Sequence, residues 1–333
     1  MNDDSTKFVC WIRHHGRTED ICTVLDWSPE YLYPVRTGRL SRERRYLTSI
    51  KQTRAIYKAA QGQATATMLP PPFMPLINRI GKSSRHIYDI HSGMFTDARW
   101  RIFLKPALMA FRDDDILLAH NPHDEAALKA ATKSHVVLFQ DPALTADLMR
   151  TGQFPRSTAS TLLEAEDRPH RPTFIFPSSG DTDEPLREFS AAVDGYFDNA
   201  RRSTMVVTGN AAPNAISSKL ISTPGFLPRT QFDKELQTAD VVVSLSTRPD
   251  ILQRAAFEAV VAGKRPLVRE STALRTILGD FAVYATGCTP SEIGAALDLA
   301  WSRRNVTSSE LQQTRNRIIG QEAEQISTLK ELL

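Results

Sequence analysis

The chain has 333 residues, of which 41% are hydrophobic and 24% are charged, and its formal net charge is +3. These values are ordinary for a soluble globular protein of about two domains, and so mild a charge does not by itself indicate a nucleic-acid partner. The three cysteines form no Cys-x-x-Cys pair and no Cys/His ligand spacing, which excludes a disulfide framework and favours a reducing compartment.

The N-terminus, MNDDSTK, is acidic and polar, unlike a signal peptide. No apolar run reaches the roughly 18 residues that are needed to span a bilayer. We therefore expect a cytoplasmic protein, either free or docked peripherally on the inner face of a membrane.

In the N-terminal half, short apolar runs alternate with helical patterns. The helix expected at 41–60 is amphipathic, and the prolines from Pro70 to Pro72 end the apolar segment that precedes them. Segments of strand length are predicted at 8–12, 64–69, 86–90, 116–119 and 136–139, and helices at 41–60, 98–111 and 123–132.

The C-terminal half repeats this alternation. The helix expected at 251–262 is closed by Gly263, and the helix at 290–303 follows Thr289, a residue type that caps helix N-termini. Strands are predicted at 173–176, 205–207, 241–245, 266–268 and 283–285, and helices at 184–197, 231–238, 251–262, 273–278, 290–303 and 308–333.

Alternation of strands and helices predicts parallel sheets with helices on both faces. The segment EAEDRPHRP, from Glu164 to Pro172, is charged, rich in proline and without hydrophobic periodicity, as linkers usually are. We therefore predict two doubly wound α/β domains, residues 1–168 and 169–307, followed by a helical segment at 308–333.

Positive charge is concentrated between Arg36 and Lys58, where Glu43 is the single acid. Such a run usually forms a solvated helix face. The functional alternative is a patch for an anionic partner, which is a lipid headgroup, a phosphorylated acceptor or nucleic acid. The residues assigned to this patch are Arg42, Arg44 and Arg45.

Small polar residues, glycine or histidine follow five of the predicted strands. Each alone is most often a turn or cap residue, but parallel strands place their carboxyl ends at one edge, where phosphate and hydroxyl ligands bind. In the first domain Asp89 and His91 flank one strand end, and His120 follows the next strand. In the second domain the loops supply Ser178, Ser179, Thr208, Gly209, Asn210, Ser246, Thr247 and Arg248.

The stretch from Leu236 to Val268 is the most informative part of the chain. A buried strand is followed by a polar loop and then by a helix that carries Glu258 among apolar residues. A buried glutamate needs a partner, and a carboxylate at this place can accept both hydroxyl groups of a ribose. Asp250 stands at the start of the same helix, where it can also act as an N-cap; a solvent-facing Glu258 is the alternative.

This stretch resembles the GT4-like group of retaining GT-B glycosyltransferases, which carries an E-x7-E element followed by a helix, a turn and a strand. The similarity covers about residues 172–300, and extends more loosely to YDIHSG at 88–93 and LLAHNPHD at 117–124. The matching residues are Asp250, Glu258, Ala259, Gly263, Lys264, Pro266, Leu267 and Val268.

The resemblance implies the GT-B fold, in which two Rossmann-like domains face each other across a cleft. It implies that the N-terminal domain binds the acceptor, that the C-terminal domain binds a nucleotide-diphosphate sugar, and that the helix at 308–333 crosses back to the N-terminal domain. Glu258 is expected at the ribose, and Asp250 near the donor sugar or its phosphates. The group needs no metal and no cofactor, since the nucleotide sugar is a substrate.

The chain departs from the group in two places. Asp250 stands where a glutamate is usual and reaches one methylene less far. Members of the group often carry Arg and Lys after the first strand of the donor domain to neutralise the diphosphate, whereas here residues 178–184 read SSGDTDE. Arg248 is the first candidate for the missing positive charge.

The implied activity is transfer of a sugar to an acceptor hydroxyl, with retention, in the synthesis of a polysaccharide or glycoconjugate. His91 or Asp89 is expected to polarise the acceptor hydroxyl or to bind the donor sugar. The acceptor is expected to be a saccharide or lipid-linked sugar, with a DNA base, as in phage-type DNA glucosylation, as the alternative. Two other hypotheses are an inactive nucleotide-sugar-binding partner, which the missing bases motivate, and a sugar-nucleotide epimerase.

Overall fold

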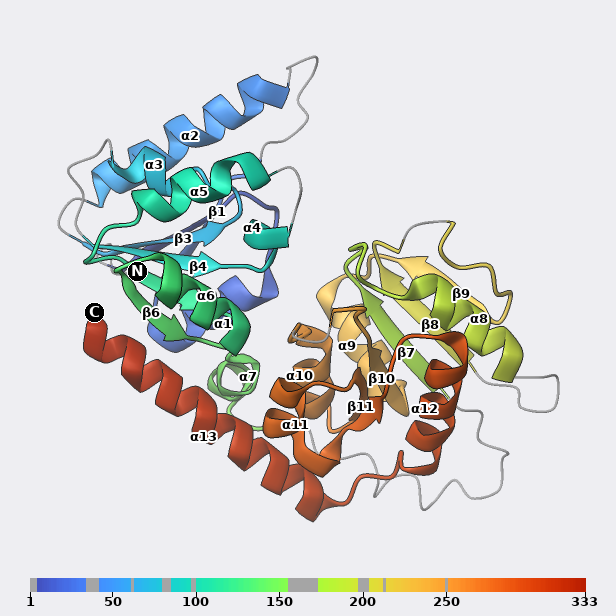
Figure 1. The fold of residues 1–333 in the computed structure, drawn as a ribbon. Helices are drawn as coiled ribbons and strands as arrows, with labels where there is room; N and C mark the ends of the chain where they lie inside the picture. Colours follow the sequence, from blue (N-terminus) through green and yellow to red (C-terminus); the bar gives the residue numbers. More distant parts are fainter. Residues whose placement is uncertain are drawn as a thin grey trace. The chain divides into compact units, whose positions relative to one another are not determined.

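The computed structural model describes residues 5–33, 42–60, 63–79, 85–96, 100–154, 173–196, 204–211, 214–248 and 251–333. The chain divides into two compact units (Figure 1). Unit 1 comprises Met1–Arg150 and Gln321–Leu333, and unit 2 comprises Thr151–Gly320. The domain boundary predicted at 168/169 lies outside the described residues.

Unit 1 contains a six-stranded parallel sheet with the order β2-β1-β3-β4-β5-β6. Its strands are β1 (Lys7–Cys10), β2 (Ser28–Tyr31), β3 (Thr65–Leu69), β4 (His86–Ile90), β5 (Ile116–Ala119) and β6 (His135–Leu138). Its helices are α1 (Gly16–Leu25), α2 (Arg42–Ala59), α3 (Met74–Arg79), α4 (Gly93–Thr96), α5 (Arg101–Ala110), α6 (Pro122–Ala131) and α7 (Ala143–Thr151).

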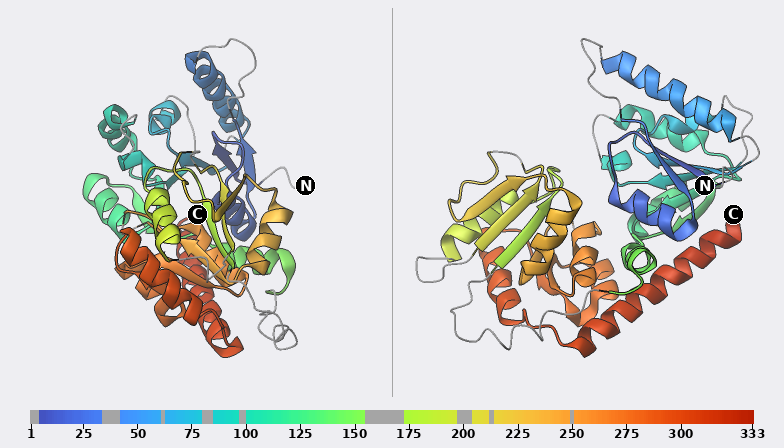
Figure 2. Two further views of the ribbon diagram at one scale, coloured as in Figure 1. Left: turned by 90° about the vertical axis from the view of Figure 1, so that its right-hand side faces the viewer. Right: turned by 180° about the vertical axis from the view of Figure 1, so that it is seen from behind.

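Both faces of this sheet are buried, because successive side chains of a strand point to opposite faces. Val9, Tyr88 and Leu117 pack on one face with residues of α2, α3, α5 and α6. Phe8 and Ile87 pack on the other face with residues of α1, α7 and the C-terminal helix. Each face of the strands therefore holds its own layer of helices, as the alternation in the sequence predicts (Figure 2).

The C-terminal segment is one continuous helix, α13 (Ser308–Leu332). Its first part belongs to unit 2, where Arg315 Nε donates to the carbonyl oxygen of Val260 at 3.1 Å. Its last part belongs to unit 1, where the Glu322 carboxylate accepts from the backbone N–H of Thr145 at 2.7 Å, at the start of α7. The helix thus contributes buried polar contacts to both units.

Unit 2 contains a second six-stranded parallel sheet, with the order β12-β11-β10-β7-β8-β9. Its strands are β7 (Thr173–Ser178), β8 (Thr204–Gly209), β9 (Ile221–Gly225), β10 (Val241–Ser244), β11 (Arg265–Arg269) and β12 (Val283–Ala285). Its helices are α8 (Leu186–Tyr196), α9 (Arg229–Thr238), α10 (Arg254–Val261), α11 (Thr272–Leu278), the 3-10 turn η3 (Gly279–Phe281) and α12 (Pro290–Ser302).

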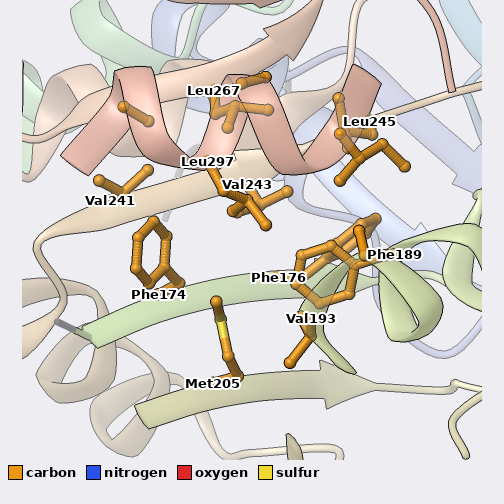
Figure 3. Close-up of a cluster of buried hydrophobic side chains, with 14 of the residues drawn as sticks. Phe174, Phe176, Phe189, Val193, Met205, Val241, Val243, Leu245, Leu267 and Leu297 are labelled. Carbon is orange, nitrogen blue, oxygen red and sulfur yellow. The ribbon is translucent and has the colours of Figure 1, made fainter. Parts of the chain in front are cut away.

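The main core of unit 2 lies between this sheet and helices α8 and α12 (Figure 3). Phe174, Phe176 and Val243 of the central strands point toward Phe189 of α8 and Leu297 of α12, and all five side chains are buried. Burial of one such large apolar side chain contributes about 1.5–3 kcal/mol to folding. This core fixes β7 between β8 and β10, so the loops that follow these three strands emerge side by side.

Seven elements of the described structure are absent from the sequence prediction: the helices α1, α3, α4 and α7, the 3-10 turn η3, and the strands β2 and β9. Helix α1 turns the polar side chains of Arg17, Thr18 and Asp20 inward, so its apolar periodicity is weak. The strands β2 and β9 lie at the sheet edges and contain Pro29 and Pro224, a residue that favours edge strands because it lacks a backbone N–H. The predicted two parallel α/β sheets are otherwise confirmed.

None of the helices in the described part of the chain combines the length and apolarity that a membrane span requires.

Candidate functional site

The carboxyl end of the unit 1 sheet is organised around Asp89, the fourth residue of β4. Its side chain is fully buried, and it binds the guanidinium group of Arg17 through both carboxylate oxygens. The shortest of these contacts joins Arg17 Nη2 to Oδ1 at 2.9 Å, and the same nitrogen donates to the carbonyl oxygen of Phe139 at 2.6 Å. Helix α1 is thereby anchored to the central strands by a buried ion pair.

Two imidazole rings complete the hydrogen bonding of this carboxylate. His91 Nε2 lies 3.0 Å from Oδ2 of Asp89, and His120 Nε2 lies 3.0 Å from Oδ1. The two rings are in edge contact, with centroids 4.1 Å apart, and His15 lies beside His91 at 4.9 Å between centroids. Loops from three strand ends therefore contribute to one cluster, which we call the Asp89 cluster: Asp89, Arg17, His15, His91 and His120.

The charges within the Asp89 cluster follow from burial and proximity. Burial opposes ionisation of Asp89, but Arg17 and the neighbouring histidines hold the pKa of its carboxyl well below the usual range. Burial and the charge of Arg17 lower the pKa of His120 to about 3, and burial and His91 lower the pKa of His15 well below its usual value. At neutral pH the cluster therefore presents an ionised carboxylate and uncharged rings of His15 and His120.

The ionised carboxylate also sets the tautomer of its partners. A carboxylate only accepts hydrogen bonds, so Nε2 of His91 and of His120 must carry the proton in each contact with Asp89. In a neutral ring, Nδ1 then keeps its lone pair. His91 can consequently accept a proton or a hydrogen bond from a hydroxyl group at Nδ1.

The unit 2 residues that the sequence predicts for the donor lie at the carboxyl ends of three neighbouring strands. Ser178 ends β7 and Ser179 follows it, Thr208 and Gly209 end β8 and Asn210 follows it, and Ser246 to Arg248 follow β10. Gly209 has a φ of +86°, and a Cβ at this position would overlap the carbonyl oxygen of Ser178. Glycine is thus required for the close approach of the loops after β7 and β8.

The loop after β7 directs its hydrogen-bond donors at an internal carboxylate. Glu184 accepts from the hydroxyl of Ser178 at 2.5 Å, from the N–H of Ser179 at 2.8 Å and from the N–H of Gly180 at 3.3 Å. The hydroxyl of Ser179 adds a fourth bond at 2.8 Å. Donor groups of the kind that bind phosphate oxygens are therefore occupied by a side chain that is itself an anion.

A second acid of this loop ties it to the loop after β10. Asp183 Oδ2 accepts from the hydroxyl of Ser246 at 2.7 Å and contacts Arg248 Nε at 3.4 Å, while the backbone N–H of Thr247 donates to the carbonyl oxygen of Asp183 at 2.7 Å. Arg248, predicted to supply the missing positive charge, thus lies in the expected loop but is paired with an acid. A small pocket beside it is lined by Ser244, Ser246, Arg248, Ile251, Gln253, Ala256, Val268, Arg269 and Leu274.

Glu258 lies on α10, as predicted, with 11% of its side chain exposed. It has the partners that a nearly buried glutamate requires: Oε1 contacts Arg229 Nη1 at 3.0 Å and Arg254 Nε at 3.1 Å. The carboxylate is therefore in place but shares one oxygen with two guanidinium groups. Arg229, on α9, is 29 residues away in the sequence and was not predicted as its partner.

Four predicted residues cannot be placed in these clusters. Asp250 lies outside the described residues. Arg42, Arg44 and Arg45 belong to the first turn of α2, and their side chains lie outside the described part of the structure.

Comparisons with family models and with curated proteins find no match to this chain. Solved glycosyltransferase structures, however, share its fold over nearly its whole length. Anabaena HepE, in complex with UDP and glucose, has a TM-score of 0.65 at 13% identity, and the match covers 97% of this chain and 100% of HepE. An α,α-trehalose-phosphate synthase (UDP-forming) from Burkholderia vietnamiensis has a TM-score of 0.64 at 13% identity, covering 98% and 99% of the two chains. The chain has the GT-B fold.

A glycosyltransferase from Rickettsia africae gives a lower TM-score, 0.59 at 12% identity, and covers 99% of this chain and 98% of its own. In this GT-B chain, unit 1 carries the Asp89 cluster, and unit 2 carries the stretch that resembles the E-x7-E element. Arg17 and His15 are the site residues that sequence reasoning missed. The sequence does indicate them, because the run His14-His15-Gly16-Arg17 follows the first predicted strand. Polar residues, glycine and histidine directly after the other predicted strands are site candidates on the same ground.

The Asp89 cluster also has the composition of a metal site. Among the described residues, one ligand atom each from Asp89, His91 and His120 lie within 4.8 Å of one another. A carboxylate with two imidazoles is a ligand set that zinc or ferrous iron can take. The hydrogen bonds to Arg17 and to both rings already use the oxygens of Asp89, and the charge of Arg17 balances it, so these contacts explain the arrangement without an ion.

Acidification should destabilise the protein through His120. In the unfolded chain a histidine gains its proton near pH 6.5, whereas His120 in the folded protein resists protonation down to about pH 3. The unfolded state therefore binds more protons in this window, and the stability falls as the pH is lowered. We expect His120 to account for a loss of about 1–2 kcal/mol between pH 7 and pH 5.

Urea unfolding at several pH values measures this effect. The substitution His120→Gln keeps an N–H for Asp89 but does not titrate, so the free energy of unfolding should vary less between pH 5 and pH 7. His123→Gln, at an exposed histidine in the first turn of α6, serves as the control and should leave the pH profile unchanged. Equal pH profiles for His120→Gln and the parent protein would contradict the assignment.

Proposed function

We propose that the chain is a metal-independent glycosyltransferase that moves a sugar from a nucleotide-diphosphate sugar to an acceptor hydroxyl, with retention of anomeric configuration. The observation that carries the proposal is the convergence of three polar loops at the carboxyl ends of β10, β7 and β8, on a GT-B fold. In this fold HepE holds UDP and glucose. The reaction would serve the synthesis of a polysaccharide or glycoconjugate, with a saccharide or lipid-linked acceptor.

The donor is assigned to unit 2. A diphosphate leaving group needs N–H groups, helix N-termini and cations directed at its developing charge. The loops after β7, β8 and β10 offer serine and threonine hydroxyls and backbone N–H groups, and Arg248 offers a cation once it leaves Asp183. Glu258 would accept the ribose hydroxyls, since a carboxylate has about four acceptor sites and the two arginines use part of them.

The acceptor is assigned to unit 1. Asp89 holds Nε2–H of His91 and leaves Nδ1 of that ring to accept the hydrogen bond of an acceptor hydroxyl. Polarising this O–H bond raises the electron density on the attacking oxygen. Arg17 acts through Asp89, because it keeps the carboxylate ionised and fixed. Asp250 would lie near the donor sugar.

The binding of a nucleotide tests the donor assignment directly. We expect one of UDP, GDP, ADP and TDP to bind at micromolar concentration in calorimetry, and Glu258→Ala to weaken it by about tenfold or more, because two charge-supported hydrogen bonds to ribose are lost. Glu188→Ala, at an exposed acid of α8, is the control and should bind as the parent does. If Glu258→Ala binds as well as the parent, the ribose role is wrong.

A second function has one observation in its favour: a nucleotide-sugar-binding partner protein without transfer activity. Glu184 occupies the donors of the loop after β7, and Asp183 holds the arginine that would neutralise the diphosphate. A protein with this loop would bind a donor weakly and stabilise a leaving diphosphate poorly. Transfer or hydrolysis of any nucleotide sugar by the purified chain would exclude this alternative.

Neutralising Glu184 should strengthen nucleotide binding. Two like charges about 4 Å apart near a protein surface repel by about 4 kcal/mol, and solvent reduces this further. We therefore expect Glu184→Gln to lower the dissociation constant of the nucleoside diphosphate by about tenfold, while leaving that of the nucleoside nearly unchanged. Glu188→Gln is the matched control. An unchanged or weaker affinity for the diphosphate would show that the phosphates do not approach this loop.

The role of His91 is separable from donor binding. If Nδ1 of His91 polarises the acceptor hydroxyl, His91→Ala should lower the turnover number by about 100-fold or more, with little change in the dissociation constant for the nucleotide. Initial rates of transfer and calorimetry with the same nucleotide give the two quantities. Equal losses in turnover and in donor binding would instead assign His91 to the donor.

A further inference from the structure

Part of one helix layer of unit 1, formed by α2, α3 and α5, is rich in exposed bases and contains a single acid, Glu43 at the start of α2. Helices α2, α3 and α5 pack on the same face of the sheet through one core cluster (Figure 1). The sequence contains neither Asp nor Glu at 46–79 or at 100–112, which include most of these helices. The exposed bases of this layer are Lys51, Arg54, Lys58, Arg101 and Lys105.

The bases of α2 form a single stripe. Lys51, Arg54 and Lys58 are spaced three and four residues apart, so they share one side of the helix with Leu47, whose exposed fraction is 56%. The opposite side of α2 packs into the core through Tyr57. The stripe therefore faces away from the sheet.

Helix α5 repeats this combination of bases and large apolar side chains. Ile102 and Met109 are 75% and 69% exposed, and Arg101 and Lys105 lie beside them on the same side of the helix. Buried Ala107 marks the side that faces the core. Ile102 and Met109 lie about two turns apart on α5. Both expose apolar surface to water, although the packing of the core does not require this.

The helices on the other face of the same sheet differ in charge. Helix α1 carries Glu19 and α7 carries Asp147, both half-buried, whereas Asp20 of α1 is buried and paired with Arg150. Helix α6, on the same face as α2, α3 and α5, also has an acidic first turn, with Asp124 and Glu125. The scarcity of acids is thus a property of α2, α3 and α5 and not of the whole layer or of the unit.

We propose that the basic-apolar surface, defined by Leu47, Lys51, Arg54, Lys58, Arg101, Ile102, Lys105 and Met109, docks unit 1 on an anionic lipid bilayer. The ammonium and guanidinium groups would contact lipid phosphates while their stems and the apolar side chains enter the interface. Nucleic acid would account for the exposed bases, because they bind phosphates, but not for the exposed side chains of Ile102 and Met109. The inference goes beyond glycosyl transfer, because it concerns the surface on which the protein docks. It does not depend on the reaction that the site performs.

Sedimentation of the full-length protein with vesicles tests the proposal. Vesicles of phosphatidylcholine alone are compared with vesicles that also contain phosphatidylglycerol, at low and high salt. We expect binding to the anionic vesicles alone, and weaker binding at high salt because exposed charges are screened. One basic residue near an anionic surface contributes about fivefold to the partition coefficient, so Lys51→Glu with Lys105→Glu should lower it by about 25-fold or more.

The apolar part of the surface has its own variant and control. Ile102→Ser with Met109→Ser should lower the partition coefficient by about tenfold or more, through lost apolar burial. Met149→Ser with Leu299→Ser changes two other exposed apolar residues and should have no effect, and Lys234→Glu with Lys330→Glu is the control for the charge reversal. Nucleotide affinity is measured on every variant, so that a failure of the donor assignment is not mistaken for a failure of docking.

Three results would overturn the proposal. The first is the absence of binding to anionic vesicles, and the second is equal binding of the test and control variants. The third is tight, salt-sensitive binding to duplex DNA or RNA that Ile102→Ser with Met109→Ser leaves unchanged, which would assign the surface to nucleic acid.

Discussion

The buried ion pair between Asp89 and Arg17 is the constraint on which the unit 1 site depends. An ionised carboxylate removed from water costs several kcal/mol unless hydrogen bonds and an opposite charge compensate it. Arg17 supplies the charge, and His91 and His120 supply the remaining hydrogen bonds. The same contacts fix helix α1 to β4 and define the tautomers of both rings, so the geometry of the site and the packing of the unit have one cause.

In unit 2 the polar loops at the carboxyl ends of the strands contain more acids than bases. Asp183 and Glu184 accept hydrogen bonds from the hydroxyls and N–H groups of their own and the neighbouring loop. These bonds connect the loops at this edge of the sheet. A diphosphate bound at these loops, as we propose, would compete with internal carboxylates, which distinguishes this chain from the pattern of the group that it resembles.

The helices on the two faces of the unit 1 sheet differ in the charges that they carry. Both cores are apolar, but the outward faces of the helices are free to vary in charge. One layer combines bases with exposed Ile102 and Met109, whereas α1 and α7 on the other side carry acids and contribute to the packing with α13. The Asp89 cluster and the surface charge are thus separate features of the same sheet.

The sequence by itself determined the alternation of strands and helices, and with it the strand ends that hold Asp89 and Ser178, the loops that hold His91 and Ser246, and the helix that holds Glu258. These features depend on local patterns of apolar and polar residues, which a single segment displays. The tertiary structure alone decided that Arg17, 72 residues from Asp89, is its partner, and that Arg229 reaches Glu258. It also decided that Glu184 binds the loop that precedes it. Such pairings follow from strand order and side-chain burial, which bring distant residues together and which no local pattern encodes.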